Sequence, residues 1–184
     1  LEENKVLFGT VDTWILWNLS KEKSHITDYT NASRTLLFNI QKLTWDKHLL
    51  NIFKVPKKIL PKVQPSGSLF GHLNSKVLGI SLPIKAICGD QQASMYAAGV
   101  KPYTTKITYG TGTFIMQIIG SKFKQHKSFF TTLAPTASKP VYALEDKIDC
   151  CGNRVDKLLK KKLSLVPIIS ALSKMVASKI KKLP

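Results

Sequence analysis

The sequence predicts an α/β fold, and two features of the chain carry this prediction. An apolar run at residues 84–88 suits a short buried strand, and after Gly89 the segment beginning at Asp90 suits a helix. Farther along, β-rich runs separated by turns occur at residues 104–108, 113–119, 129–134 and 141–144. A strand that leads into a helix, followed by grouped strands, indicates a mixed α/β architecture.

Two helices are predicted in the first half of the chain. The first covers residues 10–17, with Thr10 as a candidate N-cap and an apolar stripe formed by Val11, Trp14, Ile15 and Leu16. The second opens at residues 45–46 and has a predicted buried side of Leu49, Leu50 and Phe53. Pro56 stops this helix, because a proline inside a helix removes a backbone hydrogen bond and clashes with the preceding turn.

Polar segments connect these helices to the rest of the chain. Residues 25–27 suit a short strand, and the small polar groups at residues 27–34 suit a capped turn or the wall of a polar pocket. Residues 64–83, rich in Gly, Ser and Pro, indicate a winding surface connection. Residues 100–103 suit a linker, and we place a domain boundary there, between units at residues 1–100 and 104–184.

From Asp146 onwards the pattern predicts helices. Apolar residues recur at helical spacing as far as Leu159, and Pro167 suits the first turn of a last helix. Eight lysines and no acidic residue occur between Lys157 and Pro184, and a cationic amphipathic helix can lie on a membrane surface. A helix that packs on its own sheet with solvated lysines outside explains the same pattern and is the preferred interpretation.

The composition is that of a folded protein with a strong positive charge. At 43% hydrophobic and 9% aromatic residues the chain can bury a core. The formal net charge of +17 comes mainly from scattered lysines and is able to attract nucleic acid or anionic lipid. A lysine-rich genome, or separation from acidic segments of a longer protein, accounts for it as well, so we expect no specific nucleic-acid partner.

Several classes are disfavoured by what the sequence does not contain. No apolar run approaches the length of a membrane span, and the start has neither the features of a signal peptide nor an initiator Met, which fits an excised piece. The three cysteines form neither a disulfide framework nor a CxxC site, and the four histidines have no metal-ligand spacing. We therefore expect a cytoplasmic protein without a metal site of its own.

Asp90 is the first candidate for a catalytic residue. It would lie at the carboxyl end of a strand and in the first turn of a helix. Open α/β sheets bind their ligands at that edge, and the positive end of the helix helps to keep a carboxylate ionised. A structural role is the more common explanation of a lone aspartate there, because aspartate is a frequent N-cap.

A second polar cluster, Thr-Tyr-Gly-Thr-Gly at residues 108–112, lies between two β-rich runs. This pattern predicts a tight hairpin whose glycines leave backbone N–H groups free to face an anion, although such a motif is usually only a turn. A carboxylate about twenty residues before a phosphate-sized cradle indicates transfer of a group from a nucleotide to a hydroxyl.

Taken together, the motifs of this chain resemble those of the glycerol kinases in the FGGY carbohydrate kinase family. The matching blocks are Phe-Gly-Thr-Val-Asp-Thr-Trp, Thr-Asp-Tyr-Thr-Asn-Ala-Ser-Arg-Thr, Leu-Phe-Asn-Ile, Trp-Asp, Gly-Asp-Gln-Gln, Tyr-Gly-Thr-Gly and Tyr-Ala-Leu-Glu, at residues 8–14, 27–35, 37–40, 45–46, 89–92, 109–112 and 142–145. They cover nearly the whole chain, in order. The resemblance implies a ribonuclease-H-like (actin-like ATPase) fold, with the end of a first domain and the start of a second.

The resemblance also implies a reaction and the residues that carry it out. Family members transfer the γ-phosphoryl group of Mg-ATP to a polyol hydroxyl, here glycerol, and we expect a homo-oligomer when the protein is full length. Asp90 would be the general base and a glycerol ligand, and Gln91 would contact the polyol. The nucleotide contacts implied are Gly110, Thr111, Gly112, Gly152 and Asp156.

The chain departs from the family pattern in ways that matter for activity. The amino-terminal phosphate loop, the Arg-Glu pair that holds the polyol, and the later glycines that close over adenosine lie outside these 184 residues. Asp156 stands where glycerol kinases often have glutamine. We therefore expect the fragment alone to be inactive. Two alternatives stay open: a kinase of another sugar or polyol, and a non-catalytic basic module that binds nucleic acid or anionic lipid.

Overall fold

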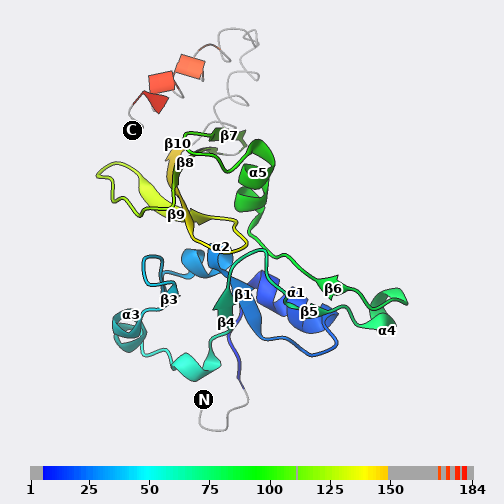
Figure 1. The fold of residues 1–184 in the computed structure, drawn as a ribbon. Coiled ribbons are helices and arrows are strands. Elements are labelled where there is room, and N and C mark those ends of the chain that lie inside the picture. The colour runs from blue at the N-terminus through cyan, green and yellow to red at the C-terminus, as the bar shows by residue number, and fades with distance from the viewer. Residues whose placement is uncertain are drawn as a thin grey trace, which may run out of the picture.

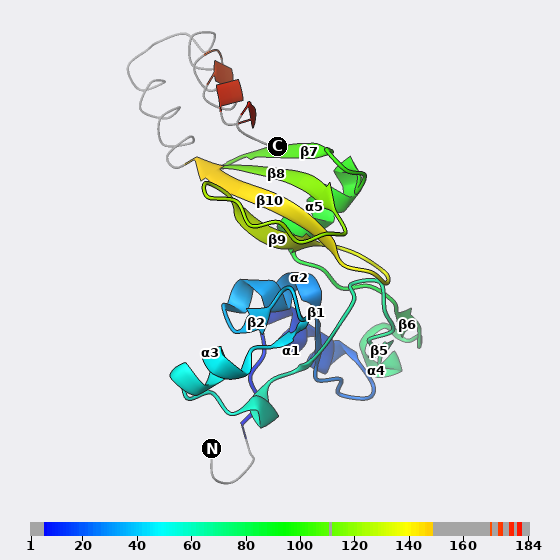
Figure 2. The same cartoon turned by 60° about the vertical axis from the view of Figure 1, so that its left-hand side comes forward.

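The computed structural model describes residues 6–110, 112–148, 170, 173–174, 177–178 and 180–181. Figures 1 and 2 show an upper body, made of a four-stranded sheet and α5, above a lower body of short strands and helices. An arm that carries β5, β6 and α4 projects from the lower body (Figure 1). Within the described ranges no helix is long and apolar enough to cross a membrane.

The sheet of the upper body is antiparallel throughout, with the strand order β7-β8-β10-β9. Its strands are β7 (Thr105–Tyr109), β8 (Thr113–Gly120), β9 (Phe130–Ala134) and β10 (Val141–Ile148). These strands confirm the four predicted β-rich runs. The helix predicted from Asp146 is wrong at its start, because residues 146–148 pair with β8 and extend β10. The remainder of that prediction, to Leu159, lies outside the described residues.

Helix α5 (Asp90–Ala98) confirms the helix predicted after Gly89, and it packs on the sheet. Met95 is fully buried against Met116, Ile118, Ala134 and Ala143. The strand predicted at residues 84–88 is wrong, since only β6 (Pro83–Ile84) is a strand, paired with β5 (Gly71–His72). No described strand pairs with residues 85–88, and an extended segment becomes a strand only with a neighbour to bond.

The lower body contains short elements around one parallel strand pair. Strands β1 (Ile26–Asp28) and β4 (Lys62–Gln64) pair in parallel, and β1 confirms the predicted short strand. The other elements are α1 (Val11–Leu19), α2 (Tyr29–Ala32), a 3-10 helix (Ser33–Thr35), β2 (Phe38–Asn39), β3 (Thr44–Trp45), α3 (Lys47–Ile52), a second 3-10 helix (Lys57–Ile59) and α4 (Ser75–Leu78). The predicted surface connection at residues 64–83 therefore holds short elements of its own.

The two predicted helices of this body lie where expected, but their buried faces differ from the prediction. In α1 only Leu16 of the apolar stripe is buried, while Val11 is 76% and Trp14 68% exposed. In α3 Leu50 is buried, while Phe53, the residue that follows the helix, is exposed. No described segment covers the exposed faces of these helices, so an apolar stripe alone did not identify the buried side. Thr10 is the N-cap of α1 by position, without a side-chain cap bond.

One hydrophobic cluster joins the two bodies. Residues of the lower body, namely Ala32, Phe38, Trp45, Leu50 and Leu60, pack with Leu133 and Tyr142 of the sheet. The Tyr142 hydroxyl donates a hydrogen bond to the Ile40 carbonyl at 2.9 Å, and the Gly67 amide donates to the Thr136 carbonyl at 2.9 Å. The domain boundary at residues 100–103 stays a prediction, and the segments on either side of it share this packed core.

Candidate functional site

A buried carboxylate organises the polar run at residues 27–34. Asp28 has no exposed surface, and its oxygens accept hydrogen bonds from the amide groups of Thr30 and Asn31 and from the Thr30, Asn31 and Ser66 side chains. A carboxylate buried this deeply is tolerated only when such donors satisfy it. The run is thus the capped turn that its sequence predicts, with Asp28 as the N-cap of α2.

This network reaches the turn that carries Asp90. The Thr30 hydroxyl, which donates to Asp28, also accepts a hydrogen bond from the Gly89 amide at 2.8 Å. A Cβ atom on Gly89 would lie 2.6 Å from the Gln92 Oε1 atom, and Gln92 is itself buried. A larger residue at position 89 would therefore displace the buried Gln92 side chain, and the hydrogen bond from Gly89 to Thr30 ties the turn before α5 to the buried network of α2.

Asp90 lies in the first turn of α5, and its side chain is exposed. The N-cap of α5 is Gly89, so Asp90 does not have the capping role that would explain an aspartate structurally. Its Oδ1 atom accepts a hydrogen bond from the Gln91 amide at 2.6 Å. The carboxylate thus lies at the positive end of the helix and is open to a ligand.

Gln91 connects this turn to strand β7. The Lys106 ammonium donates to the Gln91 Oε1 atom at 2.7 Å and to the Gln91 carbonyl at 3.3 Å. The Thr108 hydroxyl donates to the same Oε1 atom at 3.3 Å. Because β7 continues directly into the glycine hairpin, these bonds hold the Gly-Asp-Gln-Gln turn against the strand that leads to the second predicted motif.

Lys106 is buried, with 9% of its surface exposed, and it lies within the influence of two carboxylates. Burial lowers the pKa of its ammonium from the ordinary value, while the charges of Asp90 and Glu145 act in the opposite direction. Glu145 is in turn paired with Arg34, whose Nη1 atom lies 2.7 Å from Glu145 Oε2. The site is therefore flanked by charges of alternating sign, contributed by the 3-10 helix Ser33–Thr35, α5, β7 and β10.

The predicted hairpin is present between β7 and β8, where Tyr109 is paired with Thr113. The Gly110 amide donates a hydrogen bond to the Gly112 carbonyl at 3.0 Å, so the prediction that the glycines leave their N–H groups free is wrong for Gly110. A Cβ atom on Gly112 would approach the Lys147 Cε atom to 3.2 Å and the Ile148 carbonyl oxygen to 3.4 Å, whereas Gly110 has more room. Gly112 thus permits close packing of the hairpin against β10.

The structure brings part of the predicted site together. Asp90 and Gln91 lie beside β7, and Gly110 and Gly112 form the hairpin at the end of that strand. The predicted nucleotide contacts Thr111, Gly152 and Asp156 lie outside the described residues. In the described part of the chain no group of three or more His, Cys, Asp or Glu side chains is placed to hold a metal ion.

Sequence reasoning missed three members of this arrangement, namely Asp28, Lys106 and the Arg34–Glu145 pair. Arg34 and Glu145 belong to motifs that carry the family resemblance, but neither was assigned a role. The sequence does contain a signal for Lys106. This lysine lies between Thr105 and Ile107 in a β-rich run, and a charged residue is unusual in a strand of a packed sheet.

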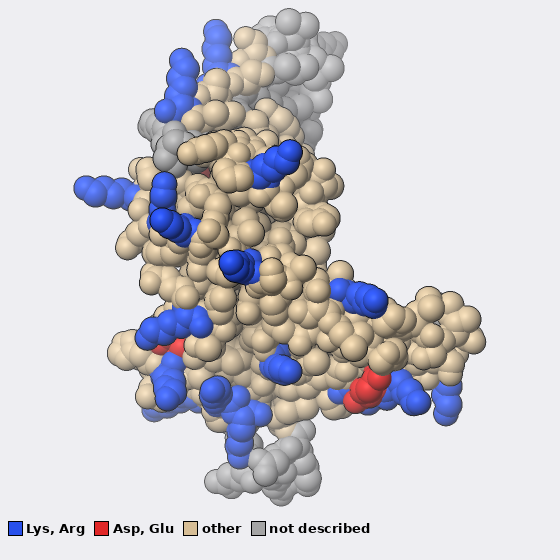
Figure 3. Space-filling view, viewed as in Figure 1, with Lys and Arg blue, Asp and Glu red and all other residues tan. Residues whose placement is uncertain are grey.

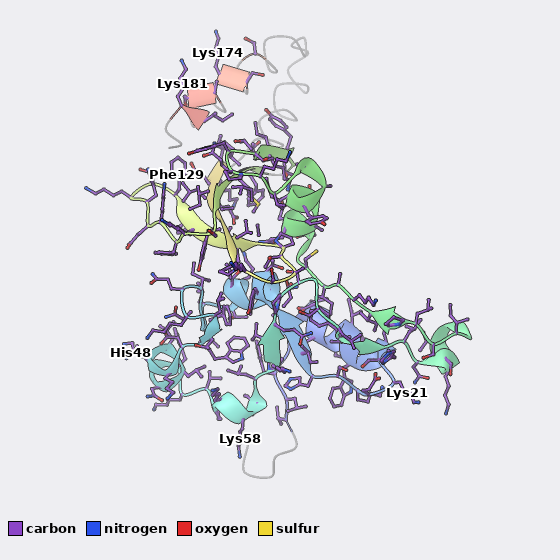
Figure 4. The ribbon with its side chains drawn as sticks, in the orientation of Figure 1. Lys21, His48, Lys58, Phe129, Lys174 and Lys181 are labelled. Atoms are coloured by element: carbon purple, nitrogen blue, oxygen red, sulfur yellow. The ribbon has the colours of Figure 1, made fainter. Side chains whose placement is uncertain are left out.

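A hollow of about 660 Å³ lies away from Asp90. It is lined from the lower body by residues such as Phe38 and Leu49 and from the upper body by residues such as Phe123 and Phe129, the last of which Figure 4 marks beside the sheet. Its size does not make it the reactive site, because the hollow has neither the helix-terminal carboxylate nor the glycine hairpin.

Comparison with known proteins gives consistent matches. Residues 2–97 match the profile of the N-terminal domain of the FGGY family of carbohydrate kinases. The chain is 47% identical over 168 residues to a glycerol kinase of Aquifex aeolicus, covering 90% of this chain and 34% of the relative. It is 45% identical over 160 residues to glycerol kinase 1 of Clostridium tetani, covering 85% of this chain and 32% of the relative.

A solved structure supports the same family assignment. The Plasmodium falciparum glycerol kinase with ADP superposes with a TM-score of 0.79 at 35% identity, over 85% of this chain and 32% of that one. The chain thus spans about a third of the length of the curated relatives that it matches. These matches confirm the predicted fold class.

Proposed function

Because the chain belongs to the FGGY family of carbohydrate kinases, we propose that the protein containing these residues phosphorylates glycerol with Mg-ATP, giving glycerol 3-phosphate and ADP. The observation that carries the proposal is the exposed Asp90 carboxylate at the start of α5, held beside the strand that enters the glycine hairpin. The identity of 47% and 45% to two glycerol kinases supports glycerol over other polyols.

In the proposed reaction a glycerol hydroxyl oxygen forms a bond to the γ-phosphorus, and the bond from that phosphorus to the β,γ-bridging oxygen breaks. Asp90 orients the hydroxyl and accepts its proton, and ADP leaves with the electron pair of the broken bond. Gln91 would contact the polyol, and Gly110, Thr111 and Gly112 would meet the nucleotide. Mg²⁺ enters as part of the Mg-ATP substrate, where it neutralises charge on the β- and γ-oxygens.

The nucleotide contacts at Gly152 and Asp156, the homo-oligomer and the domain boundary near residue 100 belong to the same proposal. The profile match to the N-terminal domain ends at residue 97, which supports that boundary. A cytoplasmic location stays a prediction from the cysteine content.

The first test is turnover by the protein expressed from its complete reading frame. ADP release that depends on glycerol would support the proposal, and faster release with another sugar or polyol would favour a different kinase of the same family. The 184-residue chain alone is expected to give no turnover, because effective-molarity gains vanish when one reactant is not held.

A second test addresses the basic-module alternative. Figure 3 shows lysine and arginine scattered over the visible face rather than gathered in one patch, which favours non-specific attraction. Retention of the chain on DNA should therefore fade steeply as salt rises and show no sequence preference. Retention that persists at high salt would instead support a dedicated nucleic-acid module.

A further inference from the structure

The side-chain amide of Gln91 has a defined orientation in this site. An ammonium group has only donors, so the Gln91 atom that lies 2.7 Å from Lys106 Nζ must be the oxygen. The Thr108 hydroxyl reaches the same oxygen at 3.3 Å. Many glutamine side chains can exchange their oxygen and nitrogen positions at little cost, but a buried cation next to one end removes that freedom.

The fixed orientation decides what Gln91 offers to a ligand. With its oxygen occupied by Lys106 and Thr108, the group left over is the Nε2 amide, which has only donors. The neighbouring Asp90 carboxylate, when ionised, has only acceptors. A hydroxyl group can donate to one of these groups and accept from the other, so the pair is complementary to an alcohol.

We propose that Lys106 is a positioning residue that holds the Gln91 amide with its nitrogen toward the substrate, and so makes the Asp90–Gln91 pair specific for a hydroxyl. This inference rests on the proposed function for the identity of the ligand, but the orientation itself follows from the Lys106 contacts alone. Lys106 does not touch the reacting atoms in this scheme; it acts through Gln91.

The charges around Lys106 suit this role. Asp90 and Glu145 favour its charged form and oppose the effect of burial. The Arg34 guanidinium donates to both oxygens of the Glu145 carboxylate. The Lys106 ammonium donates to Gln91 instead. A charged donor makes a hydrogen bond roughly twice as strong as a neutral one, so the orientation is held more firmly than Thr108 alone would hold it.

The test uses the protein expressed from its complete reading frame and the variant Lys106→Met, which keeps a stem of similar length without the charge. We expect the KM for glycerol to rise about 10- to 100-fold, in line with loss of one charge-assisted hydrogen bond. The KM for ATP should change less than about twofold, because the nucleotide does not use this amide. Lys106→Arg, which restores a cation, should recover part of the loss.

Two comparisons separate positioning from a structural effect. In a Gln91→Ala background Lys106→Met should add little, whereas a general loss of folding would be additive. Lys21→Met serves as the matched control, because Lys21 is exposed and lies in the lower body (Figure 4). Additive losses, or an equal rise in the KM values of both substrates, would overturn the inference.

A readout independent of turnover keeps the inference apart from the proposed function. In protein labelled with ¹⁵N-glutamine, the Gln91 Nε2 resonances, assigned by their absence in Gln91→Ala, should be sharp and should shift in Lys106→Met. Unchanged resonances would refute the positioning role even if glycerol kinase activity is found. Shifted resonances in a protein without glycerol-dependent ADP release would refute the function and keep the positioning role.

Discussion

Arg34 and Glu145 form a two-pronged ion pair between positions that lie 111 residues apart in the sequence. The Nη1–Oε2 distance is 2.7 Å and the Nη2–Oε1 distance is 3.3 Å. Glu145 is buried in β10, while the Arg34 side chain is 55% exposed. The pair therefore bonds the lower body to the sheet at the edge of the proposed site.

Removal of Arg34 should destabilise the protein. In Arg34→Met the Glu145 carboxylate stays buried without its partner, and we expect a loss of about 1–2 kcal/mol, discounted from a fully buried pair because Arg34 is half exposed. Urea unfolding of both proteins measures it. The double variant Arg34→Met with Glu145→Gln should recover part of the loss, and a double variant less stable than Arg34→Met would contradict this account.

Asp90→Asn should abolish most turnover while the fold survives. The side chain is exposed, and Asn retains an oxygen for the Gln91 amide, so the stability should change little. Loss of a positioned base typically lowers the rate by about 10²–10⁴-fold. A coupled ADP-release assay is the measurement, with Glu22→Gln as a distant control that also loses one negative charge. A variant that keeps more than about a tenth of the activity would exclude Asp90 as the base.

Thr30→Val should affect both stability and activity. The substitution removes a hydroxyl that donates to Asp28 and accepts from the Gly89 amide, so a buried carboxylate and a partly buried amide each lose a partner. Each such loss costs about 1–3 kcal/mol, and the turn that carries Asp90 should loosen. Thermal unfolding and kcat are the measurements. Thr35→Val is the matched control, since the Thr35 hydroxyl likewise donates one hydrogen bond and accepts one, but with Ala32 and Leu37 rather than with the turn of Asp90. Equal effects in the two variants would refute the link to Asp90.

Thr111→Val should weaken nucleotide binding more than glycerol binding. Thr111 lies outside the described residues, but its neighbours Gly110 and Gly112 close the hairpin where its hydroxyl is expected to meet phosphate. Loss of one hydrogen bond to a charged group costs about 1.5–3 kcal/mol. Calorimetric titration of each ligand decides the point, and equal weakening of both would rule out a nucleotide-side role.

Glu22 should make the protein sensitive to acid. The His72 amide and then its ring donate to the Glu22 carboxylate at 2.9 Å each, and they hold its pKa at about 2, below the ordinary 4.5. A lowered folded-state pKa stabilises the protein above pH 4.5, and this contribution is lost as the pH falls toward 2. In urea unfolding from pH 6 to 2, Glu22→Gln should lack this part of the acid loss; parallel profiles for the two proteins would contradict it.

The sequence predicted those features of the fold that depend on local pattern. The β-rich runs became β7 to β10 because alternating β-branched residues suit a packed sheet, and α5 follows Gly89 as its sequence indicates. The predicted strand at residues 84–88 failed because pairing depends on which segment lies beside it. The buried face predicted for α1 was wrong for a related reason, because burial depends on which other segments cover a helix.

The same distinction holds for the candidate site. Asp90, Gln91 and the glycines were identified from motifs, whose residues are adjacent in the sequence. The partners that fix them were not, because Lys106 bonds Gln91 from a different strand and Arg34 meets Glu145 from a different body. Contacts of this kind are set by the three-dimensional arrangement, and no spacing rule in a single sequence encodes them.

The unequal exposure of the tryptophans gives the molecule an internal optical probe. Trp14 is 68% exposed on α1, whereas Trp45 is 8% exposed and donates to the Pro61 carbonyl at 2.8 Å. Indole fluorescence moves to shorter wavelength when water is excluded, so any segment or subunit that covers α1 will shift the Trp14 emission and leave Trp45 nearly unchanged. Iodide quenching of Trp45→Phe, which keeps Trp14 and Trp17, would therefore report what covers this helix without an added label.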